Sequence, residues 1–400
     1  MEKDLYYDLV SERVQRNWEA EEYGTWRRVS NPDAVPLNFG FPYPDSYPLE
    51  DLVAACARVM REDGASALKY GGGPIAAELE RMITDRCNER GMKVEEGELL
   101  ITSGSAQGIS LSAELFLNEG DSLMVEGPTF MGALKSFQNH PVNIHAVEGD
   151  DDGVRVDDME QLLRRLSSEG RGPKFFYCIP NFNNPGGFTM SLERRRRVLE
   201  LAEEYDFMVV EDDAYGELRY EGEDLPTLRA LDDAGRVLHL GSMSKILAPA
   251  VRIGWVVGPA TLVQQMNRLK TDGGNNPLVQ ALVAACWGGL DVDCRLRKLR
   301  SGYRKRRDAA LAALEEFMPG GCNWSHPQGG YFLWVTVPDS IDVTEILPEI
   351  SEAGATPLAG TIFYPDDRGH HNLRLSFSFP EPEELSEGIR AMAGVIERHM

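Results

Sequence analysis

A lysine set among small hydroxylated residues is the feature of this sequence that points most directly to chemistry. Lys245 follows Ser242 and Ser244, and Arg252 comes seven positions after it. A lysine amine can form an imine with an aldehyde once burial or nearby positive charge lowers its pKa. The hydroxyls and the forked guanidinium can hold a phosphate. The segment therefore indicates a site for a molecule that carries both groups. The alternative is a strand-to-helix turn whose lysine reaches solvent.

A second segment suited to a phosphate follows a predicted strand at 98–102. Gly104 permits a tight turn, and Ser105 and Ala106 then lead into a predicted helix at 106–117. The first amides of a helix point along its axis, so its N-terminus is a natural seat for an anion. An ordinary serine cap is the alternative for such a segment taken alone.

Two further strand ends carry polar side chains that suit a nitrogen heterocycle. Asp212 and Tyr215 follow a predicted strand at 207–211, and Asn184 follows one at 174–179. Ligands of open α/β sheets bind beyond the carboxyl ends of strands. A carboxylate there can pair with a protonated ring nitrogen and make the ring an electron sink, while Tyr215 and Asn184 can hydrogen-bond a ring oxygen. Helix capping by Asp212 and turn formation by Asn184 are the alternatives.

Two other residues suit contacts with a ring and with a substrate. Phe130 follows the predicted strand 122–126 and could stack on a ring, although a core position is the alternative. Arg374 stands in an otherwise apolar strand at 373–378, where a buried guanidinium needs an anion. A substrate carboxylate held by both arms of the guanidinium fits this need, and a structural ion pair is the alternative.

Alternating strands and helices must position these residues. Between about 50 and 285, short apolar runs alternate with helical patterns, which predicts a mostly parallel sheet covered by helices on both faces. We expect residues 1–48, with a helix at 4–22, to pack on a small C-terminal α+β domain at 291–400. The large α/β domain then spans 49–290. Further elements are predicted as strands at 142–147, 236–240, 252–257 and 331–336, and as helices at 49–62, 74–90, 157–168, 191–205, 260–270, 293–318, 343–353 and 382–398.

Composition and spacing argue against several classes of protein. The formal net charge of −23 disfavours nucleic acid and anionic membranes as partners. The sequence has no apolar signal core and no 18-residue apolar stretch, so we expect a cytoplasmic protein. The six cysteines form no Cys-x-x-Cys pair and the seven histidines show no metal spacing, so we expect reduced thiols and no metal. No Gly-x-Gly-x-x-Gly follows a strand, which disfavours a nicotinamide dehydrogenase.

Taken together, the motifs Ser-x-Ser-Lys…Arg-x-Gly, Asn-Pro-x-Gly, Asp-x-Ala-Tyr and Arg-x-Ser-Phe resemble those of the fold-type I aminotransferases of class I/II. These enzymes depend on pyridoxal 5′-phosphate (PLP), and the subgroup of 2-aminoadipate and kynurenine aminotransferases is the most similar. The motifs occur in family order from about Leu37 to the C-terminus. The resemblance implies PLP as the cofactor and a homodimer with shared active sites.

The resemblance also implies a role for each residue. Lys245 would form the internal aldimine and shuttle the proton, and Asp212 would pair with the pyridine nitrogen. The other implied contacts are Asn184 and Tyr215 to the ring oxygen; Ser105, Ser242 and Arg252 to the phosphate; Ala106, Ser244 and Phe130 elsewhere on the cofactor; Tyr70 to the phosphate of the neighbouring subunit; and Arg374, Asn184 and Gly40 to the substrate.

The implied reaction is transamination between an L-amino acid and a 2-oxo acid in amino acid metabolism. Ala106, Gly186 and the stretch 271–276 depart from the family pattern. They favour an alternative, a specialised biosynthetic PLP enzyme that uses the same carbanion for elimination, carbon–carbon bond formation, cyclisation or oxidation. A ligand-sensing transcription regulator is a third possibility. It is disfavoured because the residues before Leu37 are too few for a winged helix.

Overall fold

An eight-stranded sheet in the order β1-β8-β7-β6-β5-β2-β3-β4 forms the centre of the computed structural model, which describes residues 6–16, 31–272 and 274–400. Strands β7, β6, β5, β2 and β3 run parallel, whereas β8 is antiparallel to β7 and to β1, and β4 is antiparallel to β3. The strands are β1 (Leu99–Thr102), β2 (Ser122–Gly127), β3 (Asn143–Asp150), β4 (Gly153–Val154), β5 (Pro173–Cys178), β6 (Met208–Asp212), β7 (Val237–Ser242) and β8 (Gly254–Val257).

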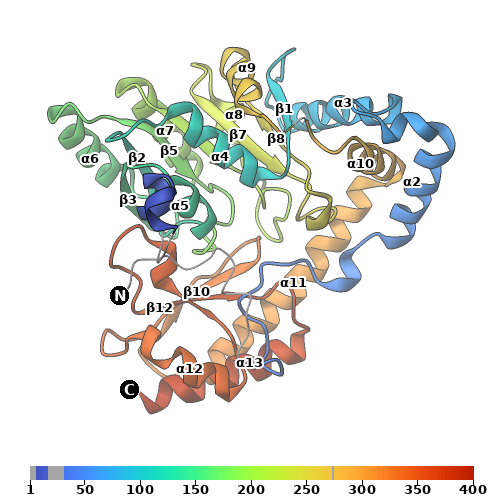
Figure 1. Cartoon of the computed structure of the whole chain (residues 1–400). Helices are drawn as coiled ribbons and strands as arrows, with labels where there is room; N and C mark the ends of the chain where they lie inside the picture. Colours follow the sequence, from blue (N-terminus) through green and yellow to red (C-terminus); the bar gives the residue numbers. More distant parts are fainter. Residues whose placement is uncertain (1–5, 17–30, 273) are drawn as a thin grey trace.

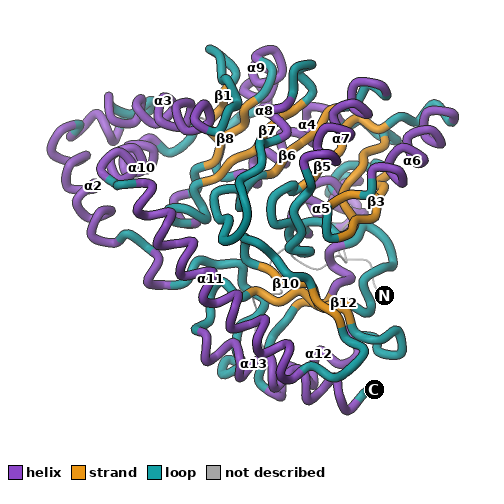
Figure 2. Tube along the Cα trace, turned by 180° about the vertical axis from the view of Figure 1, so that it is seen from behind, coloured by secondary structure: helices purple, strands orange, loops and turns teal. Residues whose placement is uncertain are grey.

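Helices cover both faces of this sheet, as the two opposite views show (Figure 1, Figure 2). Val209 packs in the cluster that contains side chains of α6 (Val156–Ser168) and α7 (Leu192–Glu204), whereas its neighbour Val210 packs in the cluster that contains side chains of α4 (Ser105–Phe116) and α5 (Met131–Gln138). Successive side chains of a strand point to opposite faces, so strands buried on both sides appear as continuous apolar runs. The helices of this part are α2 (Leu49–Glu62), α3 (Pro74–Glu89), α4 (Ser105–Phe116), α5 (Met131–Gln138), α6 (Val156–Ser168), α7 (Leu192–Glu204), α8 (Leu228–Leu231), α9 (Ala260–Leu269) and α10 (Pro277–Gly289).

A second, four-stranded antiparallel sheet forms the smaller part, in the order β11-β12-β10-β9. The N-terminal segment joins it: the backbone N–H of Ser376 donates to the Leu37 carbonyl at 2.7 Å, and Leu37 is buried in the core of this part. The elements are β9 (Asn323–Trp324), β10 (Phe332–Thr336), β11 (Leu358–Ala359), β12 (Asn372–Ser376), α12 (Val343–Ala353) and α13 (Pro382–Arg398).

One long helix, α11 (Val292–Phe317), connects the two parts (Figure 1). Near its start, Arg295 donates to the carbonyl of Ile246 at 2.6 Å, next to Lys245. Near its end, Ala310 and Leu314 are buried in the core of the smaller part. The helix therefore gives the two parts a common rigid element beside the predicted site.

The structure confirms the mostly parallel sheet and differs from the predicted elements in several places. The short elements β4, α8, β9 and β11 were not predicted. Helix α5 was not predicted. Helix α10 was not predicted either, because it is apolar on nearly every side and so lacks the periodicity of an amphipathic helix. The strand predicted at 252–257 begins only at Gly254, since Arg252 has a left-handed backbone with φ of 50°. Of the helix predicted at 4–22, the structure has a 3-10 turn (Tyr7–Leu9) and α1 (Glu12–Arg16). Residues 4–5 and 17–22 lie outside the described part.

Candidate active site

A cavity of about 580 Å³ opens where the carboxyl ends of the parallel strands face the smaller part. All predicted site residues except Tyr70 line it. These residues are Gly40, Ser105, Ala106, Phe130, Asn184, Asp212, Tyr215, Ser242, Ser244, Lys245, Arg252 and Arg374. Others that sequence reasoning did not single out complete the lining: Phe41, Met131, Ile179, Ala214, Pro249, Ala250 and Phe332.

Lys245 offers an amine that can be neutral near physiological pH. Burial, together with the charge of Arg374, lowers its pKa from 10.5 to about 8, against the opposing effect of Asp212. Its Nζ donates to the backbone carbonyl of Gly40 at 2.7 Å. The N-terminal segment that carries Gly40 thus lies directly against the reactive group.

Hydroxyl and guanidinium donors gather at one end of the cavity. The Ser242 hydroxyl donates to that of Ser244 at 2.9 Å, and Arg252 Nη2 donates to the Ser103 carbonyl at 3.0 Å. Because these groups lie beside the first turn of α4, charge, hydroxyls and helix amides all meet where an anion would sit.

Two glycines leave the space that this arrangement needs. Gly104, with φ of 83°, precedes α4, and a Cβ built on it would lie 2.7 Å from Arg252 Nη2. A Cβ on Gly254 would lie 2.6 Å from the backbone nitrogen of Ser105. Side chains at either position would displace the groups that face the anion site.

One carboxylate oxygen of Asp212 has a hydrogen-bond partner, and the other has none among the described residues. Its Oδ2 accepts a hydrogen bond from the Tyr177 hydroxyl at 2.8 Å. Its Oδ1 is buried without a hydrogen-bond partner among the described residues. Burial raises the pKa of Asp212 to about 6, and the Tyr177 hydrogen bond opposes that rise. A protonated ring nitrogen would satisfy Oδ1, so the reactive amine, the anion site and this carboxylate together fit PLP.

Arg374 and Asn184 contact each other across the two parts of the molecule. Arg374 is buried, with Nη1 donating to Asn184 Oδ1 at 3.0 Å and Nη2 to the Asn38 carbonyl at 2.6 Å. Its guanidinium lies 4.2 Å from the centre of the Phe332 ring. These contacts fix the guanidinium at the cavity wall, where it can bind a carboxylate.

A row of buried polar side chains lies on the opposite face of the sheet from Asp212. We call Glu126, Cys178, Glu211 and His239 the buried polar row; they come from β2, β5, β6 and β7 and are at most 1% exposed. His239 Nδ1 lies 2.9 Å from Glu211 Oε2. Sequence reasoning could not assemble this row, since it depends on the lateral order of the strands.

Glu126 connects this row to the segment that carries Asn184. Its Oε2 accepts from the backbone N–H of Ile179 at 2.8 Å and from Asn183 Nδ2 at 2.6 Å. Burial raises the pKa of Glu126 from 4.5 to about 7, although both hydrogen bonds act against the rise. Its other oxygen is buried without a partner among the described residues.

Asp213, the next residue after Asp212, has its own partners. It accepts from Arg90 Nη2 at 2.5 Å and from Asn181 Nδ2 at 2.7 Å. Arg195, fully buried, donates to Asn181 Oδ1 at 2.6 Å and to several carbonyls. These bonds tie the end of β6 to the turn before Asn184.

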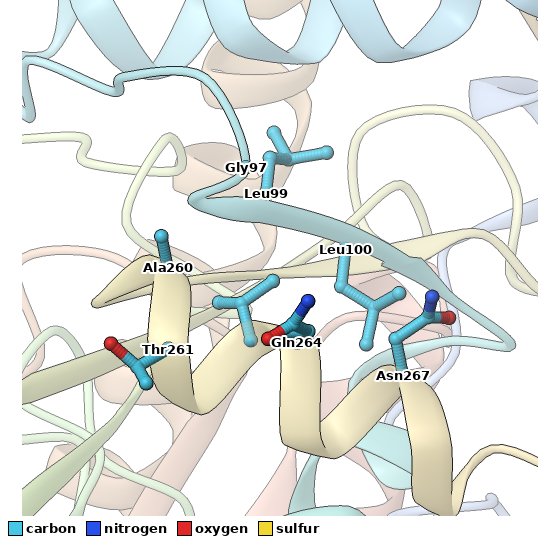
Figure 3. Close-up of a pocket in the computed structure, with 8 residues that line it drawn as sticks. Gly97, Leu99, Leu100, Ala260, Thr261, Gln264 and Asn267 are labelled. Carbon is cyan, nitrogen blue, oxygen red and sulfur yellow. The ribbon is translucent and has the colours of Figure 1, made fainter.

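Tyr70 lies apart from the site. It is 96% exposed and lines another cavity of about 850 Å³, together with Asp272 and Asn275. A third hollow, between β1 and α9, is lined by residues without a titratable side chain: Gly97, Leu99, Leu100, Ala260, Thr261, Val263, Gln264 and Asn267 (Figure 3). Neither cavity shares a residue with the site around Lys245.

Neither a metal-binding cluster nor a helix long and apolar enough to cross a membrane occurs among the described residues. In the ranges 6–16, 31–272 and 274–400, no three or more His, Cys, Asp or Glu side chains are grouped as a metal site would require. No described helix combines the length and apolarity needed to cross a membrane.

The sequence matches the family model described as aminotransferase class I and II over residues 32–392. It is 36% identical over 375 residues to aromatic-amino-acid aminotransferase 1 of Thermococcus litoralis, covering 93% of this chain and 90% of that protein. It is 31% identical to 2-aminoadipate transaminase of Thermus thermophilus, covering 92% and 91%. The crystal structure of Pyrococcus horikoshii kynurenine aminotransferase in complex with PMP superposes with a TM-score of 0.92 at 36% identity, covering 98% of each chain.

Proposed function

Because the chain belongs to the class I and II aminotransferases and is a PLP-dependent transferase, we propose that its amino donor is an L-amino acid with a large apolar or aromatic side chain. A 2-oxo acid would be the acceptor. This choice of substrate rests on the apolar side chains that line the cavity. Phe41, Met131 and Phe332 supply apolar surface beside the reactive amine.

The charges in the cavity support the same choice. Among the described lining residues, the lysines and arginines are Lys245, Arg252 and Arg374. One serves as the amine, one faces the anion site and one would bind the α-carboxylate. No further cation of this described set is left for a second carboxylate on the substrate side chain. The similarity to an aromatic-amino-acid aminotransferase agrees with this preference.

We assign the chemical roles from the geometry. When bound, PLP supplies an aldehyde that takes up the amino group and a ring that accepts the electron pair left at the substrate Cα. Lys245 Nζ would take the Cα proton and return it at the cofactor carbon, since an amine with a pKa of about 8 can act in both directions. Asp212 Oδ1 would hold the proton of the ring nitrogen, and Arg374 would orient the substrate through its α-carboxylate.

The first test measures single turnovers without an acceptor. The purified protein, loaded with PLP, is mixed with L-phenylalanine, L-tyrosine or L-kynurenine, and separately with L-2-aminoadipate or L-glutamate. We expect one oxo acid per site and larger rate constants for the first group. Lys245→Ala should abolish the reaction, whereas Lys298→Ala, a change on the exposed side of α11, should leave it intact. Faster turnover of both dicarboxylic donors would contradict the proposed substrate class.

We also propose a homodimer in which each site is completed by Tyr70 of the other subunit. Apolar side chains are exposed on α2 and the 3-10 turn after it: Leu49, Val53, Met60 and Leu68 are 43–71% exposed. Such a patch on one end of the molecule is typical of a subunit interface. Tyr70, close to this patch, lies away from the Lys245 cavity of its own chain.

Mixed subunits test this arrangement. Tyr70→Ala and Lys245→Ala homodimers are expected to be weakly active and inactive, respectively. After the two are unfolded and refolded together, hybrids carry one intact site, and random pairing would restore about a quarter of the wild-type activity. If the mixture shows no more activity than its components, Tyr70 does not act across an interface.

A further inference from the structure

Tyr177 makes one hydrogen bond that bears directly on the proposed chemistry. Tyr177 in β5 and Asp212 in β6 lie on neighbouring parallel strands, and both side chains are buried. The Tyr177 hydroxyl donates to Asp212 Oδ2 at 2.8 Å. The Tyr177 ring packs edge-on against Phe137, with the ring centres 5.5 Å apart. This contact limits the movement of the ring that carries the hydroxyl.

We propose that Tyr177 is a positioning residue that fixes the Asp212 carboxylate so that Oδ1 alone is presented to the ring nitrogen of PLP. This inference rests on the proposed role of Asp212. With Oδ2 occupied, rotation of the carboxylate would break a buried hydrogen bond to a charged group, which is unfavourable. Oδ1, which has no partner among the described residues, is the oxygen left for a donor in the cavity.

A neutral hydroxyl suits this hydrogen bond to Asp212 better than a positively charged donor would. Burial and the neighbouring Asp212 hold the pKa of the Tyr177 phenol well above its usual value, so the hydroxyl stays protonated. It therefore donates without adding a positive charge that would compete with a protonated ring nitrogen for Asp212. A lysine or arginine at this position would neutralise the carboxylate and weaken its hold on the ring.

Other charged or titratable groups also act on Asp212, and a test must separate Tyr177 from them. They are Asp213 beside it on β6, Glu126 from β2, His239 from β7 and Lys245 beyond the end of β7. Tyr177→Phe removes only the hydroxyl and leaves all of them in place. Tyr220→Phe is the matched control, because Tyr220 also donates a hydrogen bond to protein, to the Gly330 carbonyl, and does not line the cavity.

The experiment measures binding of two probes to the cofactor-free protein. Pyridoxine 5′-phosphate lacks the aldehyde, so Lys245 chemistry makes no contribution. Its carbocyclic analogue has CH in place of the ring nitrogen. Loss of a hydrogen bond to a charged group should weaken binding of the first probe to Tyr177→Phe by about tenfold. Binding of the analogue should change by less than about twofold, and Tyr220→Phe should alter neither affinity selectively.

The outcomes separate this inference from the proposed function. Equal weakening of both probes by Tyr177→Phe, or no weakening of either, would overturn the positioning role. Asp212→Asn should make the wild-type preference for the nitrogen-containing probe disappear. If the wild-type protein shows no such preference, the assignment of Asp212 to the ring nitrogen fails, whatever the Tyr177 variant does.

Discussion

Replacing Glu126 with glutamine should change how the stability of the protein depends on pH. The folded-state pKa of Glu126 is raised from 4.5 to about 7, so the folded protein holds a proton there that the unfolded chain releases. The stability contributed by the protonated form is complete below pH 4.5 and is lost as the pH rises towards 7. Each pKa unit corresponds to about 1.4 kcal/mol, so the loss amounts to roughly 3 kcal/mol above pH 7.

Glutamine cannot ionise, but its side-chain oxygen can still accept from Ile179 and Asn183. The free energy of unfolding of Glu126→Gln relative to wild type should therefore rise between pH 4.5 and 7 and then level off. Burying an amide where Glu126 has an unpartnered oxygen adds an offset, but that offset does not depend on pH.

Urea unfolding followed by tryptophan fluorescence at several pH values measures this difference. Both proteins must be compared in the same cofactor state, because a bound ligand shifts the apparent stability. Glu119→Gln, at an exposed position, controls for the change in net charge. A difference between Glu126→Gln and wild type that stays constant from pH 4.5 to 8 would refute the reasoning.

Three other predictions concern the site and the surface. Arg374→Lys removes the forked contacts of the guanidinium and should lower kcat/KM for the amino donor by about 100-fold, mainly through KM. An equal loss of PLP affinity would contradict a substrate-binding role. The rate at which cofactor-free protein forms an imine with an added aldehyde should increase with pH, with the midpoint of the increase near the Lys245 pKa of about 8. A midpoint above 10 would show that the pKa of the amine is not lowered. Finally, the net charge of −23 should make Tm rise when KCl increases from about 0.1 to about 1 M, since salt screens self-repulsion. A Tm that does not change with salt would show that the surface charges do not destabilise the fold.

Sequence patterns predicted the site residues that follow strand ends, because such residues can be recognised from their immediate neighbours in the sequence. Asp212 comes directly after a predicted strand, and Lys245 and Asn184 stand in the turns that follow two others. The parallel sheet brings such ends together. Arg374 was predicted for a different reason: a charged residue in an apolar strand needs an anion, and it lies at the cavity wall.

Tyr177 and Glu126 could not be predicted in the same way. Each lies in a strand that the sequence predicts correctly, but its role depends on which strand is its neighbour. The contact of Tyr177 with Asp212 requires β5 beside β6, and that of Glu126 with Asn183 requires β2 beside β5. The only local signal was a hydroxyl-bearing aromatic at a buried strand position, which often has a hydrogen-bond partner.

The three consecutive acids Glu211, Asp212 and Asp213 are alike in the sequence but cannot exchange places. Glu211 pairs with His239, Asp212 with Tyr177, and Asp213 with Arg90. A shift of β6 by one residue would still bring an acid to two of these three positions, but each with a side chain of another length or direction. The register of this strand is thus fixed at three points. Inserting one residue into β6 should therefore abolish cofactor binding, even though an acid would still stand at the end of the strand.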